Sequence, residues 1–311
     1  MPQTGTATAE IFAQIDTYKA GFVDAGCRRH LSTHMDFDTR ASIFKFEMSD
    51  GVSEENRRMM EMNRERTREG LIWEFGAAEK EGKLKNFIDL DIKPMSIISY
   101  HNAFYEQARI SFVMGAYYPA LVSACALGER ILNHLVIDLR DCYKGSDSYR
   151  KIYRKSSFDD WRVPIKALTE WNVLLPGVAE TFQKLMMLRN RSIHFDAGTY
   201  VTIRNDALAA IHHMRSIIET QFGSFGQQPW FVSGTRGQIF IKKQFEEHPF
   251  IKRYFVPICP FVGPLFNMEY SQEGWAFSDF QGYGEIGLSD EEYVIQFNDR
   301  DVSKLAPNKI G

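Results

Sequence analysis

The chain has 311 residues, of which 44% are hydrophobic and 25% are charged, with a formal net charge of −3. These values are ordinary for a soluble globular protein and allow for two or three structural units. The chain has no apolar run near the roughly 20 residues that a membrane-spanning helix needs. Its first residues also lack a basic region followed by an apolar one. We therefore expect a cytoplasmic protein with no membrane segment.

The four cysteines are scattered without any CxxC pair, which argues against a disulfide scaffold or a zinc ribbon. They are Cys27, Cys125, Cys142 and Cys259. Cys27, His30 and His34 have a spacing that suits metal ligands on successive helical turns, but no fourth ligand stands nearby. Isolated Cys and His side chains more often serve packing or the surface, so we expect no metal site.

Residues 1–95 form a predicted N-terminal extension of helices and one strand. Apolar spacing favours a helix over Ile11–Leu31, and alternation of apolar and charged residues predicts a strand over Ile43–Met48. Ser53, followed by acidic residues, is typical of a helix start. The helix after it is densely charged and rich in methionine, which suits either a solvated helix or a surface that meets a partner.

Residues 96–222 carry a succession of helical patterns that predict an antiparallel, up-and-down bundle. The expected helices span residues 96–114, 119–139, 161–170, 177–191 and 206–222. Glu129 falls among apolar neighbours inside the second of them, where it could pair with a buried arginine.

From Gly223 the composition changes to short apolar runs separated by turn residues, which predicts a small β-rich unit over residues 223–311. Expected strands include Gln238–Ile241, Tyr254–Val256 and Tyr293–Phe297. This unit could take the Ile43–Met48 strand into its sheet. The fold class is therefore expected to be α+β, with a helical bundle between the two flanking units.

Only the middle third of the chain is basic. Lys and Arg number 15 against 12 acidic residues in 96–222, compared with 14 against 17 in 1–95 and 8 against 11 in 223–311. This excess permits nucleic-acid binding without demanding it. Much of it lies in one connection, where cations alternate with tyrosines that suit phosphates and bases, although a solvated, mobile loop explains the pattern equally well. The cations are Lys144, Arg150, Lys151, Arg154 and Lys155.

The fourth bundle helix is expected to end in Leu188–Phe195, which places Arg189, Asn190 and His194 within six residues. On a straight helix Arg189 and His194 are offset by about 140°, so they share a cleft only if the helix loosens after Arg191. Arginine is permanently cationic and histidine titrates near neutrality, so the set suits phosphate chemistry. Taken with the helices before it and the internal Glu129, the stretch resembles the HEPN superfamily. The signature of that superfamily is an Arg, a polar residue, three to five further residues and a His.

The resemblance covers residues 96–222 and implies a metal-independent endoribonuclease that needs no cofactor. His194 would exchange a proton with the ribose 2′-OH or the leaving 5′ oxygen, while Arg189 stabilises charge on the phosphorus. Asn190 would orient His194 or the phosphate, and Arg191 either contacts the RNA backbone or is an ordinary surface arginine. The products would be a 2′,3′-cyclic phosphate and a 5′-OH. The resemblance also implies a homodimer with a composite active site.

Flanking units around such a bundle suit a regulated toxin or antiviral-defence effector, with an antitoxin or other regulatory partner. The alternative is a non-catalytic HEPN module for dimerisation or for RNA or protein binding, in which Arg189 and Glu129 form a structural ion pair. A third class, an enzyme whose chemistry lies in a flanking unit, has no Walker A, GxSxG or HExxH motif to support it.

Overall fold

The computed structural model describes residues 25–32, 37–96, 99–193, 198–223, 228–271, 274–279, 282–284 and 286–301. The protein is mostly helical, with 61% helix and small antiparallel sheets in this described part, so its character is α+β. Two compact units form, one from the described parts of Met1–His34 and Ser224–Gly311, the other from Met35–Gly223.

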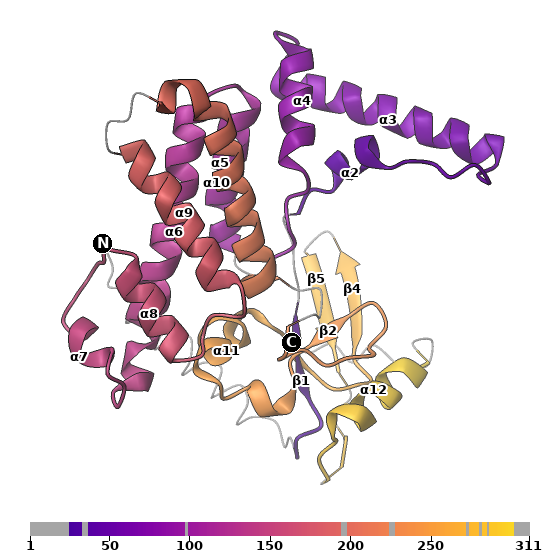
Figure 1. Ribbon diagram of the computed structural model, residues 1–311. Helices are drawn as coiled ribbons and strands as arrows, with labels where there is room; N and C mark the ends of the chain where they lie inside the picture. Colours follow the sequence, from indigo (N-terminus) through magenta and orange to yellow (C-terminus); the bar gives the residue numbers. More distant parts are fainter. Residues whose placement is uncertain are drawn as a thin grey trace. The chain divides into compact units, whose positions relative to one another are not determined.

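The larger unit is built on a bundle of four long helices that run side by side (Figure 1). They are α5 (Ser99–Val113), α6 (Tyr117–Leu139), α9 (Val178–Ile193) and α10 (Thr199–Phe222). The short helix α8 (Arg162–Glu170) packs against α6 and α9. The helices expected over 96–114, 119–139, 161–170, 177–191 and 206–222 are thus all present, and the last begins seven residues earlier than expected.

Helix α6 is the core of the bundle. Its buried residues include Leu121, Leu132 and Leu139, each at most 1% exposed, and it packs on α5, α9 and α10. By length and composition alone α6 could also cross a membrane. A largely buried core helix of a bundle passes the same criterion, and the burial of α6 here accounts for its apolar sequence.

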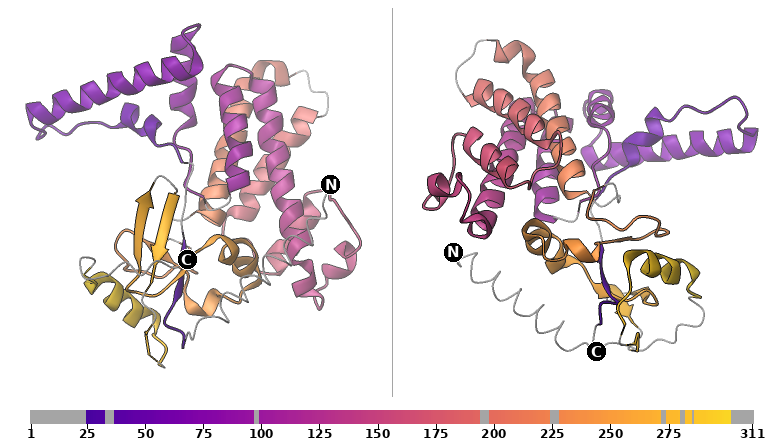
Figure 2. Two further views of the ribbon diagram at one scale, coloured as in Figure 1. Left: turned by 180° about the vertical axis from the view of Figure 1, so that it is seen from behind. Right: turned by 60° about the horizontal axis from the view of Figure 1, so that its bottom comes forward.

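Three further helices of this unit precede the bundle: α2 (Arg40–Lys45), α3 (Glu54–Phe75) and α4 (Lys80–Leu90). Helix α3 begins where expected, because the Ser53 hydroxyl accepts a hydrogen bond from the Asn56 N–H. Helix α4 packs on α5 and α10. In contrast, α3 contacts mainly α2 and α4, as Figures 1 and 2 show.

The strand expected over Ile43–Met48 is wrong, because helix α2 occupies its first half. The Arg64 guanidinium donates to the Ile43 and Phe46 carbonyl oxygens, which a strand would offer to a neighbouring strand. Phe46 is 52% exposed, so the apolar alternation does not face a core.

In the smaller unit, β1 (Arg29–Ser32) is the central strand of an antiparallel sheet between β2 (Ile239–Phe240) and β3 (Phe261–Val262). Strands β4 (Asn267–Ser271) and β5 (Gly274–Ser278) form a separate antiparallel ribbon (Figure 2). A strand from the N-terminal region therefore joins the C-terminal sheet, but that strand is β1 and not the expected Ile43–Met48. Helix α11 (Pro249–Tyr254) and the 3-10 turns Lys243–Phe245 and Val256–Ile258 complete the connections.

The helix expected over Ile11–Leu31 is wrong at its C-terminal end, where β1 lies, and its residues before Ala25 lie outside the described part. Gly26 has φ +95°, a conformation that ends a helix. All four β1 residues are buried, so a strand covered on both faces shows no alternation.

The strand expected over Gln238–Ile241 is confirmed as β2, whereas those over Tyr254–Val256 and Tyr293–Phe297 are wrong. The first is the end of α11 and the start of a 3-10 turn, and the second lies in helix α12 (Asp290–Asp299). A capping box between Ser289 and Glu292 starts α12. The pattern is helical, since Tyr293 and Phe297, four residues apart, are both 0% exposed.

Close packing of α6 on α9 depends on Gly128. A Cβ at this position would lie 2.6 Å from Leu185 Cδ2 and 3.0 Å from the Trp161 ring. We expect Gly128→Ala to lower the free energy of unfolding by about 1–3 kcal/mol through overpacking. The matched control is Gly70→Ala in α3, where nothing lies within 4 Å, and it should be stabilising by up to roughly 1 kcal/mol. Denaturant titration measures both, and equal stability of the two variants would contradict the close approach.

A second prediction concerns His101 in α5, which is 1% exposed and packs edge-on against Phe222 at 4.8 Å between ring centroids. Burial lowers the pKa of His101 from 6.5 to about 3. The unfolded chain therefore takes up a proton below pH 6.5 that the folded chain refuses, so stability falls as the pH drops from 6.5 toward 3. At pH 5 the loss from this residue is about 2 kcal/mol relative to pH 7.5.

The His101→Phe variant should lose most of this difference, as measured by urea titration at pH 7.5 and pH 5. His213 also has a pKa lowered by burial, so a small residual slope is expected. An unchanged slope in His101→Phe would show that His101 is not the group that titrates.

Candidate active site

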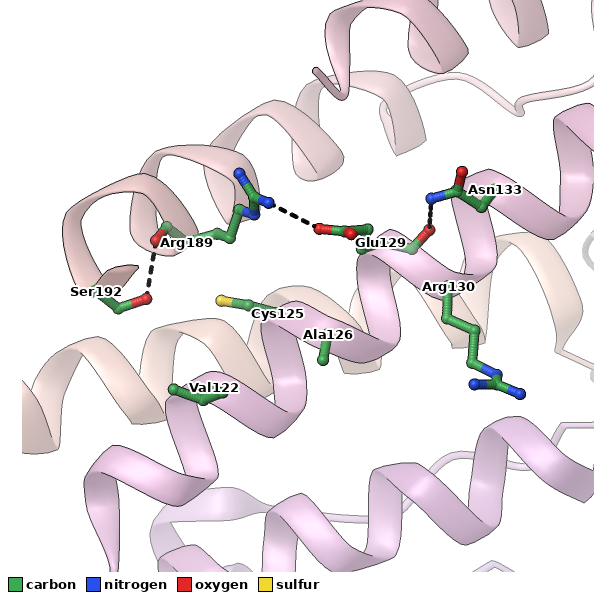
Figure 3. Close-up of a pocket in the computed structure, with 8 residues that line it drawn as sticks. All are labelled: Val122, Cys125, Ala126, Glu129, Arg130, Asn133, Arg189 and Ser192. Atoms are coloured by element: carbon green, nitrogen blue, oxygen red, sulfur yellow. Dashed lines mark hydrogen bonds and ion pairs between the residues drawn. The ribbon is translucent and has the colours of Figure 1, made fainter. Parts of the chain in front are cut away.

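Arg189 lies one turn before the end of α9 and faces α6. Leu185, four residues earlier on the same face, is 0% exposed and meets α6 at Gly128. Arg189 Nη2 is 3.0 Å from Glu129 Oε2, with the two side chains 20% and 32% exposed. Figure 3 shows the guanidinium reaching across from α9 to the carboxylate on α6. The expectation that Glu129 pairs with an arginine is therefore confirmed.

Trp161 completes a three-residue contact. Its side chain is 1% exposed, and the indole Nε1–H donates to Glu129 Oε2 at 3.1 Å. Arg189 Cζ lies 6.0 Å from the Trp161 ring centroid, within range of a cation–π attraction. One carboxylate oxygen thus receives both a cation and an indole N–H, which restricts how Arg189 can turn.

The guanidinium of Arg189 keeps unused donor capacity. Its Nε–H is buried and has no acceptor within the described ranges, and its Nη1 makes only a long contact of 3.4 Å with Asn190 Oδ1. A buried N–H without an acceptor is costly, so an anion that reaches this guanidinium would gain a ready partner.

Beside this pair lies an open groove of about 450 Å³ along the outer face of α6 (Figure 3). It is lined by Val122, Cys125, Ala126, Glu129, Arg130, Asn133, Arg189 and Ser192. Burial raises the pKa of the Cys125 thiol to about 12, so this cysteine stays protonated near neutral pH and is not a nucleophile.

Three residues of the motif have different surroundings. Asn190 is exposed, and its side chain touches Arg189. Arg191 is hydrogen-bonded to Asp206 of α10, whose other oxygen accepts the Thr202 hydroxyl at 2.8 Å. His194 lies outside the described residues.

The basic connection between α6 and α8 holds the exposed cations Lys144, Arg150, Lys151, Arg154 and Lys155. Within the described part of the chain none of them forms an ion pair, although Arg40, Arg189, Arg191, Arg204 and Arg215 all do. The short helix α7 (Tyr149–Ile152) interrupts the connection.

The connection is attached to the groove at two points. The Phe158 N–H donates to Asn133 Oδ1 at 2.7 Å, and Trp161 donates to Glu129. Asn133 and Glu129 lie one turn apart on α6 and both line the groove. Arg140 Nη1 holds the preceding stretch by donating to the Ile152 and Lys155 carbonyl oxygens at 3.2 and 2.6 Å.

No group of three or more His, Cys, Asp or Glu side chains with the geometry of a metal site occurs in the described portion. Cys27 Sγ donates to the Ile286 carbonyl at 3.2 Å, and His30 Nδ1 lies 3.2 Å from the Cys259 carbonyl oxygen. Both side chains therefore serve the smaller unit's packing. His34, the third residue with ligand-like spacing, is outside the described residues.

Comparisons with protein-family models, with curated proteins and with solved structures each found no significant match.

Trp161, Asn133 and Arg130 are groove or support residues that the sequence did not single out. Trp161 bonds to a residue 32 positions away, and no local pattern marks such a contact. Asn133 lies four residues after Glu129 and therefore on the same face of α6, whereas Arg130 directly follows Glu129. The four-residue spacing of Glu129 and Asn133 was a usable signal.

A double-mutant cycle measures the ion pair directly. We expect Arg189→Met and Glu129→Gln to show a coupling of about 1 kcal/mol in the free energy of unfolding, because the pair is only partly exposed and shares the indole N–H. Gln at 129 keeps an acceptor for Trp161. The exposed pair Glu180–Lys184 on the same helix is the control and should show little or no coupling. Equal coupling in the two cycles would mean that Trp161 adds nothing.

Proposed function

We propose that the chain is a metal-independent endoribonuclease of the HEPN type, with residues 96–222 as its HEPN-like bundle. The main support for the proposal is the position of Arg189. It lies near the end of a bundle helix and lines an open groove, and its Nε–H has no acceptor among the described residues. In the sequence His194 follows it after four residues, the spacing of the HEPN signature.

In the proposed reaction His194 removes the proton from a ribose 2′-OH or donates one to the leaving 5′ oxygen. Arg189 stabilises the negative charge that develops on the phosphate. Glu129 and Trp161 act on Arg189 by holding its orientation and do not touch the RNA. The dependence on the 2′-OH restricts cleavage to RNA and leaves a 2′,3′-cyclic phosphate and a 5′-OH.

By the same resemblance the enzyme is a cytoplasmic homodimer in which two motifs form one composite site. A role as a toxin or antiviral-defence effector, held in check by an antitoxin or other regulatory partner, follows from the extra units around the bundle. Lys144, Arg150, Lys151, Arg154 and Lys155 would bind the RNA backbone. Arg191 is a weaker candidate, because Asp206 already holds it.

The second candidate is a non-catalytic HEPN module. It is favoured by the same ion pair, since Arg189 has two partners inside the bundle before any RNA is present. A structural role predicts that loss of Arg189 harms folding, whereas a catalytic role predicts that it harms chemistry.

The two candidates differ in their response to Arg189→Lys. Lysine keeps the charge opposite Glu129 but loses the planar fork that binds a phosphate. For a nuclease we expect cleavage of total RNA in EDTA by the wild type, a fall of about 100-fold or more in Arg189→Lys and His194→Ala, and a nearly unchanged melting temperature. Product ends should be 2′,3′-cyclic phosphates.

Lys184→Ala, which removes an exposed cation from the same helix, is the matched control and should cleave normally. No cleavage by the wild-type dimer, together with a lowered melting temperature of Arg189→Ala, would favour the binding module. Cleavage that persists in His194→Ala would exclude the proposed mechanism.

A further inference from the structure

Two tyrosines and an arginine form a stacked column at α7. The Tyr149 and Tyr153 rings are stacked with centroids 5.7 Å apart, and Arg154 Cζ lies 5.0 Å from the Tyr153 centroid. The Tyr149 hydroxyl donates to Asp141 at 3.2 Å, which fixes the first ring. Tyr153 is 42% exposed and Arg154 is exposed. The column is therefore ordered within the protein and yet open to solvent.

Arg154 also forms part of the wall of an open pocket of about 510 Å³, which residues 154–160 and Val163 line. Lys155 Nζ lies 5.7 Å from the Phe158 ring centroid on one side of it. Of the two acids in the lining, Asp160 pairs with Arg162, whereas Asp159 has no partner in the described part of the chain. The pocket thus offers a guanidinium plane, an ammonium group and one unused carboxylate.

The charge around this column is mainly positive. Residues 140–162 contain seven cations and four acids, a net charge of +3 in a chain whose total is −3. Lys155 acts electrostatically on Asp160, but none of the five cations of the connection forms an ion pair among the described residues, so the segment keeps a positive field. A polyanion is the ligand that such a segment attracts, and stacked rings suit a polyanion that carries bases.

We propose that Tyr149, Tyr153, Arg154 and the adjoining pocket form a subsite for an unpaired nucleobase of RNA, separate from the groove at Arg189. The base would stack on the exposed face of the Arg154 guanidinium, which Tyr153 supports from behind. The flanking phosphates would meet Lys151 and Lys155. Asp159 would accept a hydrogen bond from an N–H on the edge of the base.

The subsite rests on the proposed function, because it takes RNA to be the ligand. It adds the requirement that this part of the RNA be unpaired, because stacking on the column needs a free face of the base. The attachments Phe158 to Asn133 and Trp161 to Glu129 fix the connection to the helix that lines the groove. One RNA strand could therefore occupy the subsite while its scissile phosphate lies near Arg189.

The test separates stacking from charge. The probe is a fluorescent 2′-O-methyl RNA 12-mer, which cannot undergo 2′-OH attack. The full-length chain is titrated against this RNA as a single strand and as a duplex, and fluorescence anisotropy gives the Kd of each. Arg154→Lys keeps the charge but removes the plane, and Tyr153→Leu keeps an apolar side chain but removes the ring. Arg58→Lys, at an exposed arginine of α3 outside the basic connection, is the matched control.

We expect Arg154→Lys and Tyr153→Leu to weaken single-strand binding by about fivefold or more, the scale of one lost stacking contact. Arg58→Lys should stay within about twofold of the wild type because it keeps the charge and Arg58 lies outside the proposed subsite. Duplex affinity should change little in any variant. Equal effects of Arg154→Lys and Arg58→Lys, or no RNA binding by the wild type, would overturn the subsite.

The cleavage assay in EDTA makes the two failures distinguishable. Binding that depends on Arg154 without any cleavage would retain the subsite and reject the nuclease. If the wild type cleaves RNA, and Arg154→Lys and Tyr153→Leu cleave it equally well with unchanged single-strand affinity, the nuclease proposal is retained and the subsite is rejected.

Discussion

The arrangement of the candidate site depends on one carboxylate, that of Glu129. Its Oε2 lies 3.0 Å from Arg189 Nη2 and 3.1 Å from Trp161 Nε1, so it joins α6 to α9 and to the start of α8. Because the indole is fully buried and the arginine mostly so, removal of this oxygen would leave two donors without an acceptor in a poorly hydrated place. The contact is also chemically useful, since it fixes a guanidinium at the mouth of a groove while leaving some of its N–H groups unused.

The bundle was largely predictable because its helices are long and strongly amphipathic, so a period of 3.6 residues repeats several times in each. Short segments were not. Tyr293–Phe297 is a short apolar run of the kind that strands contain, but it follows the capping box of Ser289 and Glu292, which starts a helix. Arg29–Ser32 carries charged and polar residues, yet it is a fully buried central strand. Arg29 has an acceptor in Asp290 at 2.7 Å, which propensity rules cannot foresee.

The candidate site was predictable where its residues share a motif or a helix face. Arg189 and Glu129 lie on two bundle helices that pack on each other, and the sequence already allowed for their ion pair in the non-catalytic alternative. Trp161 was not foreseen as a partner because it precedes a short helix and reaches Glu129 only after the connection has folded back. Arg191 had two equally good interpretations from sequence, and its bond to Asp206 now gives it a structural role.

The central position of β1 has a consequence for how the chain is made. Its partners β2 and β3 begin at Ile239 and Phe261, 207 and 229 residues after the last β1 residue, Ser32, and the larger unit is encoded between β1 and these strands. On the ribosome the helical unit, whose contacts are mostly local, has its full sequence before the small sheet has its second strand. The strand Arg29–Ser32 therefore cannot pair until β2 and β3 have been synthesised. Until then Leu31 lacks its cross-strand partner Phe240, and Arg29 lacks its ion-pair partner Asp290. The slow step of maturation is accordingly expected to be closure of the small sheet around a strand that was synthesised first.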